Sequence, residues 1–349
     1  MTINSLPRTH YERAYEFLKE ITDIDVIFQE IQKDLGDSPS FKEFCIKLSD
    51  STIRGFTSDN DKFNTLLANI LFHTFMMKKN HEKIYHVTPQ LAVKLAQTDI
   101  NIDSHFIKSP FREIYISIDP GLFSVTDPQG VYPVHGFYVY FNDQDGVKEL
   151  RIMASAILPN TEEIAFNDTL FYYKMYFKEG KIKEQVKDTL AIHMNKKEEL
   201  DKYGGAANMD HIEEFTYFVI NTLLYITSKD PDVREQLPVD FKAKIEGKKS
   251  PGKIKKLMKM AKRYTTYPIV VVGGSITDAM NQVDEVRRAG GIGNWKLTMR
   301  VYVSGHWRAQ WYGSAEAKES KVIFIEPYYK GPELAEVINK KFQVGSTVS

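Results

Sequence analysis

The chain has 349 residues, 42% of them hydrophobic and 12% aromatic, and its 46 basic side chains are balanced by 46 acidic ones. This composition excludes a disordered polypeptide and allows a sizeable buried core, in up to two domains. The zero net charge excludes a protein that covers nucleic acid or an anionic membrane with its whole surface, so any such contact must come from a local patch.

No sequence feature indicates an oxidising compartment or a membrane. The single cysteine, Cys45, cannot form an internal disulfide, and we expect it on the buried side of a helix. The N-terminus has no continuous apolar segment of a secretory signal. The longest apolar run, 65–77, falls short of the roughly 20 residues that span a bilayer. We therefore expect a cytoplasmic protein without membrane contact.

Residues 8–80 have the periodicity of helices. Apolar residues recur every three or four positions from Tyr11 to Ile24, and Ser40 is suited to cap the start of a further helix. The segment 60–80 is apolar on most of its circumference, which predicts a central, buried helix.

From residue 83 to 180 the pattern changes to short segments rich in β-branched and aromatic residues, separated by turn formers. Asp145-Gly146 is a typical tight hairpin turn because both residues tolerate positive φ angles. We expect a largely antiparallel sheet with one helix at 88–97. The predicted strands are 83–87, 112–118, 135–141, 148–158 and 169–177.

A helix with a buried stripe from Phe215 to Leu223 is predicted next, with Asp210 as its N-cap and Glu213 completing the cap. Residues 242–263 then contain ten Lys or Arg and a single acid, Glu246, which indicates a linker.

The fold class that follows is α+β. N-terminal helices and a largely antiparallel sheet with a packed helix form one domain over 1–240. A basic linker or amphipathic helix covers 241–263. A small C-terminal α+β module covers 264–349, with strands predicted at 267–276, 296–308 and 320–329 and a helix at 277–288.

The segment "VSGHWRAQWYGS", residues 303–314, concentrates residues that suit recognition. On a strand His306, Arg308 and Gln310 share one face, and Trp307 and Trp311 share the other. Either the tryptophans fill a core at a sheet edge, or the polar face holds a phosphate while an exposed ring stacks on a base. Antiparallel pairing with 320–329 could bring Glu326 close to His306 or Arg308, as a partner that holds the arginine or as a catalytic group.

Together, "VSGHWRAQWYGS" and "VIFIEPYYKGP" resemble the C-terminal signature of a widespread, uncharacterised group of bacteriophage and mobile-element proteins. The resemblance covers about forty residues strongly, with weaker similarity in "SPFREIYISI", "VHGFYVYF" and "VINTLLYITS". It implies a genomic context and that these residues act together, but it implies no activity.

The basic stretch also has two interpretations. As a helix after Pro251 it places Ile254, Leu257, Met258 and Ala261 on one side and lysines on the other. It is then either a solvated amphipathic helix or a surface for phosphates. Its candidate binding residues are Lys253, Lys255, Lys256 and Lys259.

An enzymatic alternative places a pocket in the sheet of 83–180. His86 on one strand and Tyr115 on the next, with Glu326 or Glu213, resemble the nicotinamide site of ADP-ribosyltransferases. The strand–Gly-Gly–helix pattern of "VVVGGSITDAM" also permits a phosphate at a helix N-terminus, but it lacks the spacing of known nucleotide motifs. The histidines show no metal-ligand spacing, so we expect neither a metal nor a cofactor.

Three functions remain open. The first is a phage or mobile-element accessory protein that binds RNA or DNA through its C-terminal module. The second is a nucleotide-using enzyme, and the third is an inhibitor or effector that binds a host or phage protein. Tyr, Trp and Arg also predominate at protein interfaces, so composition does not separate the first from the third.

Overall fold

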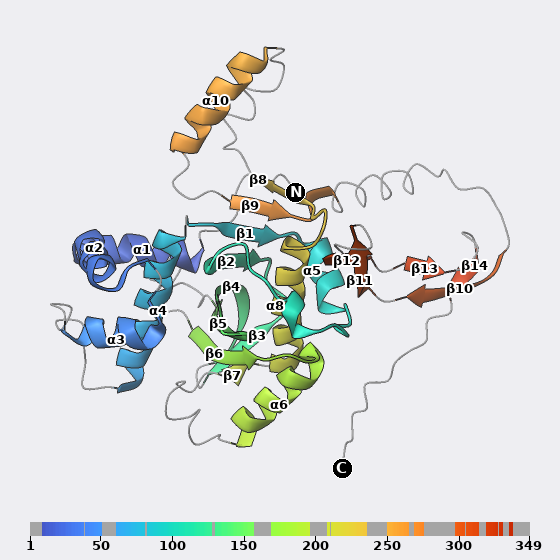
Figure 1. Cartoon of the computed structure of the whole chain (residues 1–349), viewed down its shortest axis with the longest axis horizontal. Coiled ribbons are helices and arrows are strands. Elements are labelled where there is room, and N and C mark those ends of the chain that lie inside the picture. The colour runs from blue at the N-terminus through green and yellow to red at the C-terminus, as the bar shows by residue number, and fades with distance from the viewer. Residues whose placement is uncertain are drawn as a thin grey trace.

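The structure is a computed structural model (Figure 1). It describes residues 9–37, 39–50, 61–80, 82–127, 130–156, 169–195, 208–209, 211–235, 250–264, 269–275, 297–303, 305–313, 319–326, 328–330 and 335–337.

A mixed sheet forms the centre of the molecule. Its strand order is β6 (Thr169–Phe177), β5 (Val147–Ala156), β4 (Gly130–Gln144), β2 (Glu113–Ile118), β1 (Ile84–Val87), β9 (Ile269–Val272) and β8 (Val233–Glu235). β3 (Ser124–Asp127) extends it by pairing with the start of β4 and with β7 (Asn208–Met209). The predicted α+β class and the predicted strands between 83 and 180 are confirmed.

The sheet differs from the prediction around β1. β1 runs parallel to both β2 and β9, while the other neighbouring strands are antiparallel. All four residues of β1 are buried, as is typical of a parallel strand covered on both faces. β9 was expected in the C-terminal module, but it lies in the central sheet, because its apolar residues complete the uncovered edge of β1.

Helices cover both faces of the sheet, as Figure 1 shows. Alternate residues of β4 point to opposite sides: Tyr138 and Tyr140 pack in the cluster of the N-terminal helices, and Phe137 and Val139 in the other cluster. The N-terminal side holds α1 (His10–Ile21), α2 (Ile24–Leu35), α3 (Phe41–Asp50) and α4 (Asp61–Lys79). The opposite side holds α5 (Pro89–Ala96), α6 (Ile182–Asn195) and α8 (Ile212–Ile226).

The N-terminal helices begin at specific caps. Thr9 and Glu12 form a reciprocal capping box at α1. At α3 the Ser40 hydroxyl accepts from the Glu43 amide at 3.3 Å, and the Glu43 carboxylate accepts from the Ser40 amide at 2.8 Å, so the predicted cap is confirmed. α4 is buried almost continuously from Leu67 to Met77, as its apolar circumference predicts.

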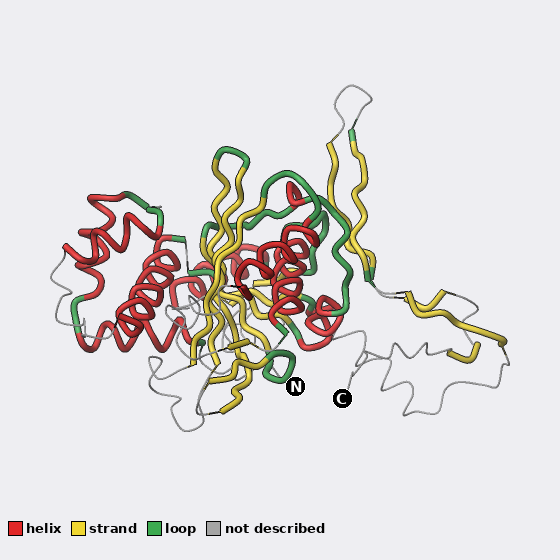
Figure 2. Tube along the Cα trace, turned by 90° about the horizontal axis from the view of Figure 1, so that it is seen from below, coloured by secondary structure: helices red, strands yellow, loops and turns green. Residues whose placement is uncertain are grey.

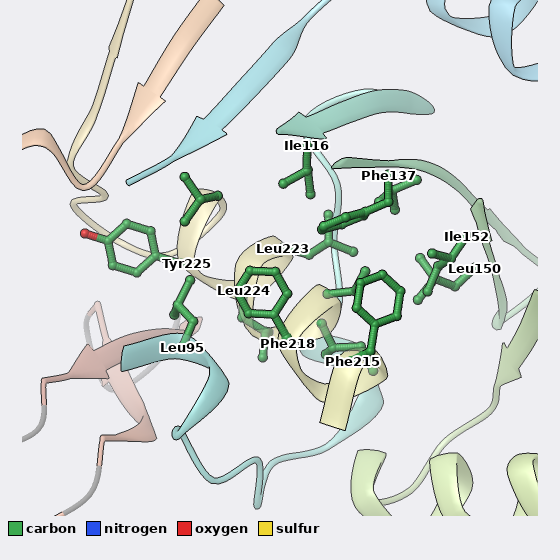
Figure 3. Packing of buried hydrophobic residues seen from close by; sticks show 14 of the residues in the cluster. Leu95, Ile116, Phe137, Leu150, Ile152, Phe215, Phe218, Leu223, Leu224 and Tyr225 are labelled. Atoms are coloured by element: carbon green, nitrogen blue, oxygen red, sulfur yellow. The ribbon is translucent and has the colours of Figure 1, made fainter. Parts of the chain in front are cut away.

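On the opposite side α8 is the central helix. Figure 3 shows Phe215, Phe218 and Leu223 directed toward Phe137 and Ile116 of the sheet. The predicted buried stripe is confirmed, but the predicted cap is not. The residue that precedes α8 is His211, in the left-handed conformation at φ 58° and without a side-chain capping bond.

The C-terminal part adds a hairpin and a second small sheet. β11 (His306–Tyr312) pairs with β12 (Glu319–Ile325), and β10 (Leu297–Val303) pairs with β13 (Tyr328–Lys330) and β14 (Ala335–Val337). Figure 2 shows the β11–β12 hairpin projecting from the helical layer. The basic stretch forms α10 (Pro251–Tyr264).

Candidate functional site

The β11–β12 hairpin contains the residues that the sequence singled out. Its antiparallel register sets Trp307 opposite Phe324 and Trp311 opposite Ser320. Trp307 is buried against Phe324, with ring centroids 4.9 Å apart, whereas Trp311 is 66% exposed. One face of the hairpin therefore carries an apolar stripe that starts in the core and continues into solvent.

A buried hydrogen-bond network fixes the base of this stripe. The indole N–H of Trp307 donates to Oδ1 of Asn221 at 2.7 Å. The amide nitrogen of Asn221 donates to the carbonyl oxygens of Leu95, at 2.8 Å, and Thr98, at 3.0 Å. Leu95 lies in the last turn of α5 and Thr98 just after it, so the Asn221 amide binds the backbone where this helix ends. One amide thus joins α5, α8 and β11.

Three further contacts hold the hairpin. The Asp99 amide donates to the carbonyl of Gly305 at 3.2 Å, and the Lys229 amide donates to that of Val322 at 3.4 Å. Lys94 of α5 forms an ion pair with Glu326 at 2.9 Å. The expected pairing of Glu326 with Arg308 or His306 is therefore replaced by one with Lys94, because α5 packs beside the end of β12.

The second face of the hairpin is polar and basic. A terminal nitrogen of Arg308 donates to Oε1 of Gln310 at 3.2 Å. Two ammonium groups lie near the Tyr312 ring, with Lys229 at 4.5 Å and Lys321 at 6.0 Å from its centroid. We call Arg308, Tyr312 and Lys321 of this face, together with Trp311 of the opposite face, the hairpin surface. It offers stacking, apolar and charge-assisted contacts, which is the chemistry of recognition.

The predicted basic candidates lie on α10. Lys253, Lys255 and Lys256 are exposed, and Ile254 and Leu257 are half-buried. Lys259 belongs to the same helix, but its side chain lies outside the described residues. The helix expected after Pro251 is present, residues 241–249 lie outside the described residues, and the choice between a solvated helix and a phosphate surface stays a prediction.

The structure does not assemble the enzymatic constellation. Tyr115 is buried, its hydroxyl lies 3.0 Å from the Ser155 hydroxyl, and it packs on the N-terminal helices' side of the sheet. Glu326 pairs with Lys94 on α5, and Glu213 accepts from Tyr217 on α8, both on the opposite side. His86 is also buried, which lowers the pKa of its imidazole.

The Gly-Gly segment after β9 likewise offers no phosphate site. The amides of Gly273 and Ser275 donate to Asp232, the first to its carbonyl at 2.8 Å and the second to its carboxylate at 2.5 Å. An acidic side chain thus occupies the position that an anion would need. The predicted helix at 277–288 lies outside the described residues.

One buried polar pair escaped the sequence analysis. Nδ1 of His73 on α4 lies 3.0 Å from Oε1 of Glu113 on β2, and both residues are almost fully buried. Burial raises the pKa of Glu113 well above its ordinary value and lowers the pKa of His73 to about 3, so burial favours the neutral form of both groups. Sealed from solvent, the pair has a structural role.

Asn221 also escaped the sequence analysis, although it left a signal. It stands in the apolar run "FVINTLLYI", where an amide must find hydrogen-bond partners once the helix is buried.

Among the described residues no group of three His, Cys, Asp or Glu side chains could hold a metal ion. No described helix is both long and apolar enough to cross a membrane.

The hairpin thus combines a buried anchor, Trp307, with an exposed ring, Trp311. A family model described as "AcrVA2-like: Anti-CRISPR type V subtype A2 family" matches residues 85–329, more than half of the chain. The chain therefore belongs to the AcrVA2-like family of anti-CRISPR proteins, and the expected phage or mobile-element accessory protein is confirmed at that level. The signature resemblance of the two C-terminal motifs stays a prediction.

Other comparisons add little. A solved structure described as a crystal structure of AcrVA2 is 13% identical, with a TM-score of 0.49, and the alignment covers 94% of this chain and 99% of that chain. A search of curated proteins gave no match.

Proposed function

We propose that the protein inhibits a type V CRISPR system by binding a protein component of it, the effector or its complex, through the hairpin surface. Membership of the anti-CRISPR family supports the inhibitory role. The single observation that supports the surface is Trp311, which is 66% exposed on the stripe that Trp307 fixes in the core.

An exposed tryptophan on a rigid hairpin suits a protein partner for two physical reasons. Burial of its large ring removes much apolar area from water, and the anchored strand loses little conformational entropy when it binds. Arg308 and Tyr312 lie on the opposite face of the same two-stranded hairpin, and Trp, Tyr and Arg are the residues that contribute most to protein interfaces. We expect the partner to present an apolar pocket with carboxylates at its rim.

Binding of nucleic acid by the same surface is less well supported. Trp307 was a candidate for base stacking, but its ring is buried and its N–H is bonded to Asn221. Lys321 lies 3.3 Å from a Glu319 carboxylate oxygen, which weakens its attraction for phosphate. Among the described rings of the hairpin only Trp311 is largely exposed, whereas single-strand binders stack successive bases on several rings.

The test replaces Trp311 by alanine. We expect the Trp311→Ala variant to bind the effector at least about tenfold more weakly, because centrally placed tryptophans often contribute 2 kcal/mol or more. It should also protect phage less well in bacteria with an active type V system. The melting temperature should stay unchanged, since the ring contributes little to the core.

Ile192→Ala is the matched control. Ile192 is 58% exposed on α6, so its loss also removes an exposed apolar side chain, but away from the hairpin. This variant should bind and inhibit as the wild type does. Equal effector affinity of the wild type and Trp311→Ala would refute the proposed surface, and absence of protection by the wild type would refute the inhibitory function.

A further inference from the structure

The charged residues of α10 are all basic, and they lie on one side of the helix. Six of its 14 residues are Lys or Arg and none is acidic. At 100° per residue all six fall within one half of the helix circumference, while Ile254 and Leu257 fall in the other half. The six basic residues are Lys253, Lys255, Lys256, Lys259, Lys262 and Arg263.

The position of α10 leaves this half accessible. Figure 1 shows α10 standing apart from the layers of helices and sheet. The lysines whose side chains are described, Lys253, Lys255 and Lys256, are exposed. Ile254 and Leu257 on the other half are half-buried. The basic half is thus the more open side of the helix.

The rest of the chain has the opposite charge. The whole sequence balances 46 basic against 46 acidic residues, so without the six charges of α10 the remainder has 40 basic against 46 acidic. A polyanion is therefore repelled by the remainder and attracted by α10, which orients the molecule during an encounter.

We propose that α10 binds the backbone of double-stranded DNA. The basic residues extend over about 15 Å of helix, along which duplex DNA presents one negative charge per roughly 1.7 Å, so each of the six side chains has a phosphate within reach. The major groove of B-form DNA is about 12 Å wide and admits a helix, whereas that of A-form RNA is too narrow. This activity is separate from effector binding by the hairpin surface.

An anionic membrane is the weaker alternative. Insertion between lipid headgroups needs an open apolar face, and the described apolar side chains of α10 are half-buried. Vesicles of anionic lipid therefore serve as a comparison in the experiment.

The experiment measures binding of the full chain to a short DNA duplex by fluorescence anisotropy. Each phosphate contact adds about 0.9 to the salt slope, so six contacts predict about a thousandfold loss of affinity between about 50 and 200 mM salt. A variant with Lys253, Lys255, Lys256 and Lys259 changed to Gln keeps two contacts and should lose only about tenfold over that range. It should bind more weakly at the lower salt concentration.

A control variant changes four exposed lysines elsewhere, Lys33, Lys42, Lys108 and Lys187, to Gln. It alters the net charge equally and should keep the wild-type slope. Circular dichroism verifies that both variants remain folded. Lack of duplex binding at low salt, equal losses in the two variants, or tighter binding of single-stranded RNA or anionic vesicles would each overturn the proposal.

Discussion

At the scale of single residues, the interior holds two polar arrangements with different purposes. The Asn221 amide uses both donors and its acceptor to hold the hairpin. The His73–Glu113 pair is less complete, because Oε2 of Glu113 is buried and has no hydrogen-bond partner among the described residues. A buried carboxyl group with an unpaired oxygen costs less free energy as the neutral acid than as the charged carboxylate.

This pair leads to a prediction about pH. Burial raises the pKa of Glu113 above its ordinary value of 4.5, so the folded protein retains a proton that the unfolded chain releases. The resulting stabilisation is complete below pH 4.5 and is lost as the pH rises through the raised pKa. The Glu113→Gln variant has no such loss, because its amide is neutral at every pH.

We therefore expect the free energy of unfolding of Glu113→Gln to increase relative to that of the wild type as the pH rises above 4.5. The change cannot exceed a factor of ten in the unfolding constant per pH unit. Urea unfolding at three pH values measures it. A difference that is the same at every pH would show that Glu113 is ionised when folded.

At the scale of elements, patterns that depend on neighbouring residues were predictable and contacts between distant elements were not. The turn at Asp145-Gly146 was correct, with φ angles of 53° and 76°, because its chemistry is local. The sequence could not show which of Trp307 and Trp311 is buried, because both lie on one face of β11. Only the position of the packed helices decides which ring is covered. The partner of Glu326, Lys94, lies 232 residues away in the sequence.

Gly136 on β4 gives a prediction at this scale. A Cβ atom at this position would lie 2.7 Å from carbon atoms of the buried Tyr115 ring on β2. Gly136→Ala should therefore destabilise the protein by about 1–3 kcal/mol, because the ring has no space to move. Gly252→Ala, where nothing lies within 4 Å, is the control and should be close to neutral. Equal unfolding midpoints in urea for the two variants would contradict this packing.

At the scale of the whole molecule, the sequence predicts two domains separated by residues 241–263. The central sheet, however, contains strands from both sides of this segment. β9 pairs with β1 along four residues, from Ile84 with Ile269 to Val87 with Val272. The sequence predicted β9 as a strand but not its neighbours, because parallel pairing between distant segments leaves no mark in local periodicity.

A chain that ends at residue 240 tests the predicted first domain. Its β1 would become an edge strand, and the buried surfaces of Tyr85 and Val87 would open to water. We expect this fragment to unfold at lower urea concentration than the full chain, with a shallower transition. Equal midpoints for the fragment and the full chain would indicate that residues 1–240 fold independently.

The hydrogen bond between Trp307 and Asn221 also has a kinetic consequence. It joins residues 86 positions apart, and its acceptor is in place only after α8 has docked against the end of α5. Closing so long a loop is entropically costly, so this contact should form late in folding. The indole proton should exchange with solvent only when the hairpin detaches, and its exchange rate would report how often the β11–β12 hairpin opens.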